Sequence, residues 1–419
     1  MIAHNAIYAQ SGGVTAVINA TASGVIQTAR QHTMKIRNVL AAKNGVVGVL
    51  REELIDTSRE SDRAIEQLLH VPGGAFGSCR FKLQNTDPKD PVVNRLFEVF
   101  KAHDVRYFFY NGGGDSQDTL HKIAKLGEQF SYPIQCIGIP KTVDNDLAIT
   151  DCSPGFGSVA KYIAVSTKEA ALDVQSMCDT STKVFILEVM GRHSGWIAAA
   201  GGLAGSGPDE PPHIILFPEV IFDAEKFAEA VKKVVKNHGF CVVVASEGIR
   251  LSDGQFVAES SSKDAFGHTQ LGGVGATLAD SIQRDLGYKV HYAIADYLQR
   301  AAGHLVSKVD QEQAFNVGKS AVELAVQGAR DVMVVIKRES NNPYRWSIDT
   351  ADVSQVANIE KTLPSEYIRD DGYGITAEAR EYLLPLVSGE SFPVYRDGLP
   401  DYQRLKLDFV ARKLPEFQV

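Results

Sequence analysis

A lysine and two carboxylates fall within one short stretch, PKTVDND at residues 140–146, and together they could move a phosphoryl group. Asp144 and Asp146 are two positions apart, so in an extended turn their side chains share a face. One of them can accept a proton while the other tunes it or holds a metal ion through water. Lys141 could neutralise charge on a phosphoryl group in transit. A solvated turn is the alternative, but the stretch directly follows the apolar run PIQCI, and this coincidence favours chemistry.

Two glycine-rich segments carry residue types that hold phosphate. In SGGVTA, residues 11–16, Gly12 and Gly13 lack β-carbons, so backbone N–H groups can approach a phosphate closely. A helix predicted over residues 15–29 would point its positive N-terminus at the same place. A plain turn is the alternative. In NGGGDSQDT, residues 111–119, Asp115 could hold Mg²⁺, which usually takes one or two carboxylates plus phosphate oxygens. The alternative role of Asp115 is a helix N-cap.

Further along the chain, three motifs carry groups that suit a phosphorylated, polyhydroxylated ligand. In EVMGRHSGW, Arg192 follows a glycine, and its guanidinium fork suits a phosphate. His193 beside it is interpreted as a local hydrogen-bonder. Glu247 ends the apolar run FCVVVAS and could reach hydroxyls from a rigid strand, with surface capping as the alternative. In YLQR, Tyr297 and Arg300 are three apart, on one side of a helix; a core tyrosine with a solvated arginine is the alternative.

Short apolar runs must position these groups. The runs are NAIYAQ, VRYFFY, PIQCIGI, KVFILEV, HIILF, FCVVVAS and DVMVVI. Each is followed by glycine-rich or polar residues and then by a stretch of helical period. This alternation predicts an α/β fold with a parallel sheet covered on both faces, in which ligands collect beyond the carboxyl ends of the strands. At 419 residues the chain can hold two such lobes, and we expect the crossover near residues 153–158.

Composition excludes several classes of protein. The 43 Lys and Arg against 51 Asp and Glu give a net charge of −8, which argues against broad binding to nucleic acid or anionic membrane. The five cysteines are scattered and contain no CxxC pair, so we expect reduced thiols and a cytoplasmic protein rather than a disulfide framework. No run approaches the length of a membrane span, and the N-terminus lacks the pattern of a signal peptide.

Two other signatures lack their required context. GFGSVA, residues 155–160, matches the dinucleotide fingerprint but follows a polar, proline-containing segment instead of a strand. VGKS, residues 317–320, resembles the end of a phosphate-binding loop, but Gln313 occupies the position of the earlier glycine. We therefore expect neither a nicotinamide-dependent dehydrogenase nor a P-loop enzyme.

The set SGG, GGGDS, PKTVDND, EVMGR, SEG and YLQR, in that order, resembles the 6-phosphofructokinase family, specifically its pyrophosphate-dependent branch. The resemblance runs from about residue 5 to about residue 325. It implies two Rossmann-like lobes with mostly parallel sheets and an active site in the cleft between them. Residues 1–157, completed by 301–419, would bind the diphosphate donor, and residues 158–300 would bind the sugar phosphate. The implied reaction is reversible, Mg²⁺-dependent phosphorylation of fructose 6-phosphate to fructose 1,6-bisphosphate with diphosphate as donor.

The resemblance also implies roles for individual residues. Asp144 would be the base that takes the proton from the sugar's 1-hydroxyl, and Lys141, Asp115 and Arg192 would share in catalysis. Donor binding would involve Gly12, Gly13, Arg80, Asp115 and Lys141. Sugar-phosphate binding would involve Thr142, Val143, Asp144, Asp146, Met190, Gly191, Arg192, Glu247, Tyr297 and Arg300, with Lys183 and His291 reaching a neighbouring subunit's site. The family thus implies a homodimer or homotetramer.

Two positions decide the donor. In ATP-dependent relatives of the family, glycine stands at the positions of Asp115 and Lys141. A carboxylate at Asp115 would occupy the space and mimic the charge of a nucleotide's α-phosphate, so a nucleotide should be repelled. Lys141 supplies positive charge close to the transferred phosphoryl group, where it counts most in the transition state. Both favour diphosphate over ATP.

The sequence departs from the family pattern in four places. Gly114 stands where many members have a Mg²⁺-binding aspartate, so Asp115 is the expected metal ligand. Lys183 and His291 fall near positions usually held by arginine, and Tyr297 replaces a histidine of the ATP-dependent branch. About 95 residues at the carboxyl end carry no assigned motif; we expect them to pack on the first lobe or to build an oligomer interface. An ATP-dependent phosphofructokinase and a catalytically silent phosphate-binding regulator are the alternative functions.

Overall fold

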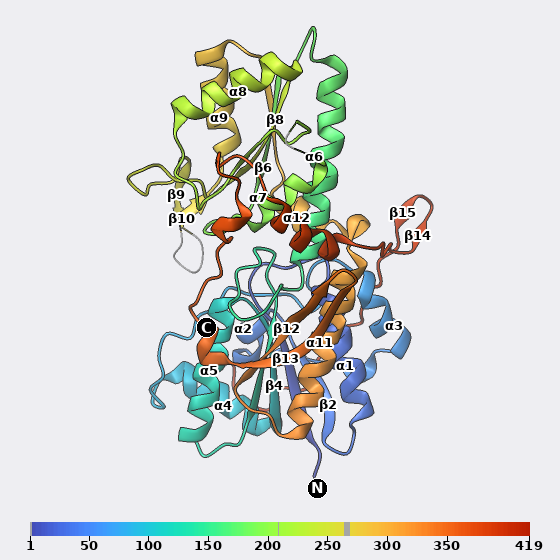
Figure 1. Ribbon diagram of the computed structural model, residues 1–419. Helices are drawn as coiled ribbons and strands as arrows, with labels where there is room; N and C mark the ends of the chain where they lie inside the picture. Colours follow the sequence, from blue (N-terminus) through green and yellow to red (C-terminus); the bar gives the residue numbers. More distant parts are fainter. Residues whose placement is uncertain (1, 208, 264–268) are drawn as a thin grey trace.

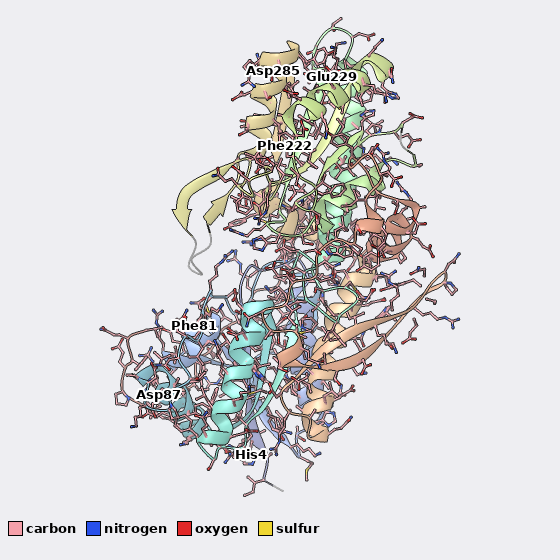
Figure 2. The ribbon with its side chains drawn as sticks, turned by 60° about the vertical axis from the view of Figure 1, so that its left-hand side comes forward. His4, Phe81, Asp87, Phe222, Glu229 and Asp285 are labelled. Atoms are coloured by element: carbon pink, nitrogen blue, oxygen red, sulfur yellow. The ribbon has the colours of Figure 1, made fainter. Side chains whose placement is uncertain are left out.

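Two lobes, each built on its own sheet, make up the protein, whose computed structural model describes residues 2–207, 209–263 and 269–419 (Figure 1). The first lobe has a seven-stranded sheet in the order β13-β12-β5-β4-β1-β2-β3, and the second has a four-stranded sheet in the order β11-β6-β8-β7. In the turned view of Figure 2, Phe81 and Asp87 lie on the first lobe, while Phe222, Glu229 and Asp285 lie on the second. This architecture confirms the predicted α/β class.

Most neighbouring strands run parallel. In the first sheet only β2–β3 and β12–β13 are antiparallel pairs, and in the second sheet every pair is parallel. All seven predicted runs form strands. The strands are β1 His4–Gln10, β2 Ile36–Ala42, β3 Leu54–Asp56, β4 Val105–Gly112, β5 Gln135–Pro140, β6 Val184–Val189, β7 Ile214–Leu216, β8 Cys241–Ser246, β9 Glu259–Lys263, β10 Thr269–Leu271, β11 Val290–Ile294, β12 Val332–Asn341, β13 Tyr344–Asp352, β14 Tyr395–Arg396 and β15 Leu399–Pro400.

Helices cover the sheets of both lobes (Figure 1). The α-helices are α1 Ile18–Gln31, α2 Gly45–Leu50, α3 Asp62–Gln67, α4 Pro91–Ala102, α5 Gly114–Gln129, α6 Phe156–Met177, α7 Trp196–Gly201, α8 Ala224–His238, α9 Val274–Leu286, α10 Asp296–Ala301, α11 Lys308–Gln327 and α12 Ala377–Leu383. Short 3₁₀ helices are η1 Thr57–Arg59, η2 Leu68–His70, η3 Gly202–Ala204, η4 Gly303–Leu305, η5 Val353–Gln355, η6 Ser365–Tyr367 and η7 Leu384–Val387.

One predicted helix start was wrong. Helix α1 begins at Ile18 rather than at Thr15, because Thr15 Oγ1 accepts the N–H of Val17 and forms a turn first. The positive end of α1 therefore does not directly follow the glycines at 12 and 13. The chain reaches the second sheet through α6, which starts within the predicted crossover.

Strand β4 shows why the first sheet is buried on both faces. Phe108 and Tyr110 belong to the apolar cluster on one face, and Phe109 belongs to the cluster on the other, since neighbouring side chains of a strand point to opposite faces. All three are fully buried. Burial of each such ring contributes roughly 1.5–3 kcal/mol to stability. Such a continuous apolar run is typical of a strand in a parallel sheet that is covered on both faces.

The carboxyl-terminal part of the chain divides between the two lobes. Strands β12 and β13 extend the first sheet. Residues 365–387 contact both lobes: Ile215 of the second lobe donates its N–H to the Tyr373 carbonyl at 2.9 Å, and Tyr382 donates to the Asp151 carbonyl of the first lobe. The chain then returns to the first lobe, where Val410 donates its N–H to the Leu54 carbonyl. Residues 365–387 thus lie between the lobes, and the assignment of residues 301–419 to the first lobe, like the two-lobe division of function, stays a prediction.

The structure explains the two rejected signatures. Gly155 and Ser158, at the start of α6, donate their backbone N–H groups to the buried carboxylate of Asp310. A side chain of the protein thus already occupies the anion position at that helix end. Residues 317–320 lie inside α11, where no phosphate-binding loop can form. Among the described residues, no helix is long and apolar enough to cross a membrane.

Candidate active site in the cleft between the lobes

A cleft of about 1040 Å³ lies where the carboxyl ends of strands from both sheets meet. The first sheet contributes the residues after β1, β4 and β5, and the second contributes those after β6, β8 and β11. The cleft is lined by Gly13, Arg80, Lys82, Gly114, Asp115, Lys141, Thr142, Val143, Asp144, Asp146, Leu147, Met190, Arg192, His193, Ser194, Glu247, Leu271, Asp296, Tyr297, Arg300, Asn358, Ile359 and Glu360. Most of the predicted site residues are therefore brought together by the fold.

The glycines after β1 leave room for two cations. A β-carbon on Gly12, whose φ is +75°, would lie 3.2 Å from Lys141 Nζ. A β-carbon on Gly13 would lie 2.6 Å from a guanidinium nitrogen of Arg300, closer than real contacts allow. Two positive side chains, one from each lobe, thus converge on this loop. The glycines keep the space into which a phosphate can approach those cations.

Asp115 lies in the first turn of α5 and forms an ion pair with Lys82, whose Nζ is 2.9 Å from Asp115 Oδ1. It does not act as the helix N-cap, because Gly113 holds that position without a side-chain hydrogen bond. The alternative capping role is therefore wrong. The positive N-terminus of this 16-residue helix favours negative charge at the same place. Gly114 also lines the cleft, and a β-carbon there would meet no atom within 4 Å.

Burial has the largest effect on the pKa values of the charged residues that follow β5. It lowers the pKa of Lys141 to about 8, against the opposing effect of Asp146 and Asp144. Burial, together with the negative charges of Asp146 and Glu247, raises the pKa of Asp144 to about 7. Burial likewise raises the pKa of Asp146, whose Oδ1 is a buried atom without a hydrogen-bond partner in the described part of the chain. Asp144 is thereby poised to gain or lose a proton near neutral pH.

Several hydrogen bonds hold the loop that carries these carboxylates in one conformation. Thr142 Oγ1 accepts the backbone N–H of Asp144 at 3.1 Å. Asn145 adopts a left-handed backbone with a φ of +54°, and its side chain accepts the N–H of Ser153. The Asn145 amide also donates to the hydroxyl of Tyr382 on α12. The loop backbone from which the two carboxylates project is therefore held by local contacts and by one side chain from a distant part of the chain, that of Tyr382.

On the second lobe, the residues after β6 and β8 are joined to each other. Gly191 has a φ of +133°, and a β-carbon there would lie 2.6 Å from the Ser194 carbonyl oxygen, so only glycine fits. Its N–H donates to Glu247 Oε1 at 3.4 Å. Burial raises the pKa of Glu247, while Arg192 opposes the rise. The arginine and the glutamate thus form one charged and hydrogen-bonding wall of the cleft.

Helix α10 supplies Tyr297 and Arg300 to the cleft. The Arg300 guanidinium lies 3.9 Å from the centre of the Tyr297 ring, which confirms that the two share one side of the helix. The backbone N–H of Met190 donates to Gln299 Oε1 at 3.4 Å, so α10 is tied to the end of β6. Arg300 reaches across the cleft to Gly13 of the first lobe. The core-tyrosine alternative is wrong, since Tyr297 is 61% exposed.

Four predicted residues do not line this cleft: Gly12 and Gly191 each lie next to a lining residue, whereas Lys183 and His291 lie away from it. Lys183 precedes β6, and His291 is the second residue of β11, whereas the cleft residues follow the opposite ends of both strands. The fold of one chain does not bring them to the site. Their predicted role in a neighbouring subunit's site stays a prediction.

Sequence reasoning missed several lining residues. Lys82 could have been found, because it lies two positions after Arg80 and in extended chain shares its side. No local signal marks Asn358, Ile359 and Glu360, which come from the unassigned carboxyl-terminal part. Glu360 accepts a hydrogen bond from His193 Nδ1 at 2.9 Å. His193 is thus the hydrogen-bonder that was expected, but its partner lies far away in the sequence.

Comparison with known proteins adds independent information. The family model described as Phosphofructokinase matches residues 5–325. A protein from Halomonas elongata named pyrophosphate--fructose 6-phosphate 1-phosphotransferase is 58% identical over 419 residues, all of both chains. The crystal structure of a pyrophosphate-dependent phosphofructokinase from Marinobacter aquaeolei is 58% identical with a TM-score of 0.91, covering 99% of this chain and 100% of that one. Its counterpart from Nitrosospira multiformis is 56% identical with a TM-score of 0.92, and both chains are fully covered.

Proposed function

This chain belongs to the phosphofructokinase family, and from that premise we propose that it transfers a phosphoryl group reversibly between diphosphate and the 1-hydroxyl of fructose 6-phosphate. One observation carries the proposal. Lys141 and Asp144, which follow β5, line the same cleft as Asp115, which follows β4. A cation, a base poised near neutral pH and a carboxylate beside the donor position are what transfer from a small inorganic donor needs.

In the proposed step, Asp144 takes the proton from the 1-hydroxyl as that oxygen attacks a phosphorus atom of diphosphate. The bond between that phosphorus and the bridging oxygen breaks, and inorganic phosphate leaves. Lys141 neutralises charge on the migrating group. In the reverse direction, protonated Asp144 returns its proton to the sugar oxygen. Its raised pKa suits both directions.

The donor preference rests on Asp115 and Lys141. The carboxylate of Asp115 lies in the first turn of α5 beside the cleft, where it would repel a nucleotide's α-phosphate. The names of the relatives from Halomonas elongata and Marinobacter aquaeolei, which specify pyrophosphate, support this donor over ATP. Gly12, Gly13 and Arg80 would complete the donor site.

Mg²⁺ fits the residues of the cleft. The described residues contain no cluster of three or more His, Cys, Asp or Glu side chains that could hold a metal, but Mg²⁺ commonly takes only one or two carboxylates plus phosphate oxygens. Asp115 would be one ligand, and the buried, unpartnered Asp146 Oδ1 is a second candidate. When bound with diphosphate, Mg²⁺ would neutralise phosphate charge.

The sugar phosphate would lie against the second lobe. Arg192 and Glu247 offer a guanidinium and a carboxylate to phosphate and hydroxyl groups. Tyr297 and Arg300 would hold the 6-phosphate, with Met190 and Gly191 shaping the wall. Thr142, Val143 and Asp146 would line the reacting end of the sugar beside Asp144.

An assay with two donors tests the function. Purified protein is given fructose 6-phosphate and Mg²⁺ with either diphosphate or ATP, and formation of fructose 1,6-bisphosphate is measured. We expect turnover with diphosphate and little with ATP. Equal turnover with ATP, or an Asp115→Gly/Lys141→Gly double variant that works as well as the native protein with diphosphate, would reject the donor assignment in favour of an ATP-dependent phosphofructokinase.

We also propose that the protein works in the cytoplasm as a homodimer or homotetramer. The cysteines of the described chain are free thiols, as a reducing compartment allows. Strand β11 is the end strand of its sheet, and Tyr292, Ile294 and Leu298 on or beside it are 47%, 46% and 67% exposed. A second copy covering this edge would bury them. Light scattering should give a molar mass of two or four times 45.5 kDa, whereas the mass of a monomer at assay concentration would contradict the proposal.

A further inference from the structure

A short piece of the carboxyl-terminal chain, residues 358–363, crosses the mouth of the cleft from the first lobe to the second; we call it the crossing segment. In Figure 1 the chain between β13 and α12 passes from the lower lobe to the upper one. At the first lobe, the amide of Asn358 donates to Asp118 Oδ1 on α5 at 3.1 Å. Asn358 and Glu360 both line the cleft. The crossing segment is therefore part of the wall of the site.

The backbone of the crossing segment pairs with the carboxylate loop. Glu360 and Leu147 form an antiparallel bridge, and Lys361 donates its N–H to the Asp146 carbonyl at 2.7 Å. The Asp146 main chain is thus held directly by a residue that lies far along the sequence. Such pairing restricts the backbone from which the Asp144 and Asp146 side chains project.

The ammonium group of Lys361 holds the far end of the same loop. It donates to the carbonyls of Thr150 and Asp151 at 3.0 and 2.8 Å. It also lies 5.3 Å from the centre of the Trp196 ring, a favourable place for a cation. A buried ammonium is costly unless it is hydrogen-bonded, so these carbonyls and the loop stay together. Burial lowers the pKa of Lys361 to about 8.

The crossing segment also binds the second lobe. The Lys361 carbonyl accepts the indole N–H of Trp196 at 3.2 Å, and Glu360 accepts from His193. The N–H of Leu363 donates to Glu219 Oε1, which also accepts the N–H of Gly195. His193 and Gly195 follow closely on Arg192 of the sugar side. One segment therefore joins the carboxylate loop to the loop that bears Arg192.

From these contacts we propose that Lys361 is a positioning residue for phosphoryl transfer, which sets the carboxylate loop relative to the second lobe. The proposal rests on the proposed function, because it assigns the reacting base to that loop. The side chain touches no reacting atom; it acts through the carbonyls of residues 150 and 151. Misplacing a reacting group by about 1 Å can cost a hundredfold in rate. Loss of the ammonium should therefore slow turnover more than it weakens binding.

The test compares Lys361→Met with a matched control, Lys161→Met. Lys161 is also buried, and its ammonium donates to a carbonyl of the carboxyl-terminal chain, that of Gly389, at 2.7 Å, outside the cleft. Both variants should lose thermal stability. We expect Lys361→Met to reduce kcat at least about tenfold while the KM values for fructose 6-phosphate and diphosphate stay within about threefold. Lys161→Met should keep the native kcat. Equal kcat values in the two variants would overturn the proposal.

A second variant at position 361 and a second phosphoryl donor keep the test decisive. If Lys361→Met does not fold, as judged by circular dichroism, Lys361→Gln takes its place, since its shorter neutral amide cannot reach both carbonyls; a native kcat in that variant overturns the proposal. Each variant is assayed with diphosphate and with ATP. If the native protein used ATP instead, the donor assignment would fail, while the ratio of kcat between native protein and variant would still test the role of Lys361.

Discussion

The two halves of the cleft differ in what their side chains offer. In the half built by the first lobe, where we propose that the donor binds and which we call the donor half, Arg80, Lys82 and Lys141 line the cleft together with Asp115, which pairs with Lys82. In the half built by the second lobe, where we propose that the sugar phosphate binds and which we call the sugar half, Arg192, Glu247 and the aromatic ring of Tyr297 line the cleft. The first arrangement suits a compact, highly charged ligand. The second suits a ligand that combines one phosphate with several hydroxyl groups.

This difference indicates that specificity has a different basis in each half. Charge should decide which ligand binds in the donor half, because a buried ammonium acts strongly on a nearby phosphoryl group where water is excluded. Hydrogen bonds from the wall of the cleft should decide which ligand binds in the sugar half. There the backbone N–H of Gly191 donates to the side chain of Glu247. Asp144 also lines the cleft, and in the proposed mechanism it would serve both substrates.

The largest effect is expected where the halves meet. Replacing Asp144 with asparagine removes the proposed base but keeps the shape of the side chain, and kcat should fall at least about a hundredfold. The matched control is Asp331→Asn, a carboxylate that pairs with His121 before β12, at the opposite end of the sheet. Steady-state kinetics of both variants with diphosphate should separate them. Near-native turnover of Asp144→Asn would remove the mechanism.

A pair of substitutions then sharpens the contrast between the halves. Lys141→Met should lower kcat/KM for diphosphate by about a hundredfold, because a preorganised cation is lost from the transition state. Glu247→Gln should instead raise the KM for fructose 6-phosphate roughly tenfold, the scale of one charge-assisted hydrogen bond. Each KM is measured at saturation with the other substrate. If both variants altered the same constant to the same extent, the division of the cleft into two halves would be wrong.

The smallest effect concerns pH. The kcat/KM for the forward reaction should rise as Asp144 ionises near pH 7 and fall as Lys141 loses its proton near pH 8, since the base must be deprotonated and the cation protonated. Asp146 raises the pKa of Asp144, so Asp146→Asn should move the acid limb to lower pH. Lys141→Met should abolish the alkaline limb. An acid limb that stays in place, or moves to higher pH, in Asp146→Asn would contradict the assignment of that limb to Asp144.

Much of the fold followed from local pattern. All seven predicted runs became strands, because apolar residues with turn-forming residues after them define a buried strand without reference to the rest of the chain. The start of α1 was mispredicted, because a single hydroxyl, that of Thr15, formed a local turn that periodicity does not reveal. The role of Asp115 as an N-cap was also excluded only by the structure, which pairs it with Lys82.

The sequence by itself determined which chemical groups follow which strands, and the expected parallel strands placed Lys141, Asp144 and Asp115 at the edge of the sheet where ligands bind. Only the tertiary structure decided that Arg300 would reach Gly13, that Glu360 would line the cleft, and that Lys361 would bond the carbonyls of the carboxylate loop. The reason is physical: whether a run of residues forms a strand depends largely on its own local pattern. Burial, and the pKa changes that it causes, depends on chain segments packed together across the whole length of the molecule.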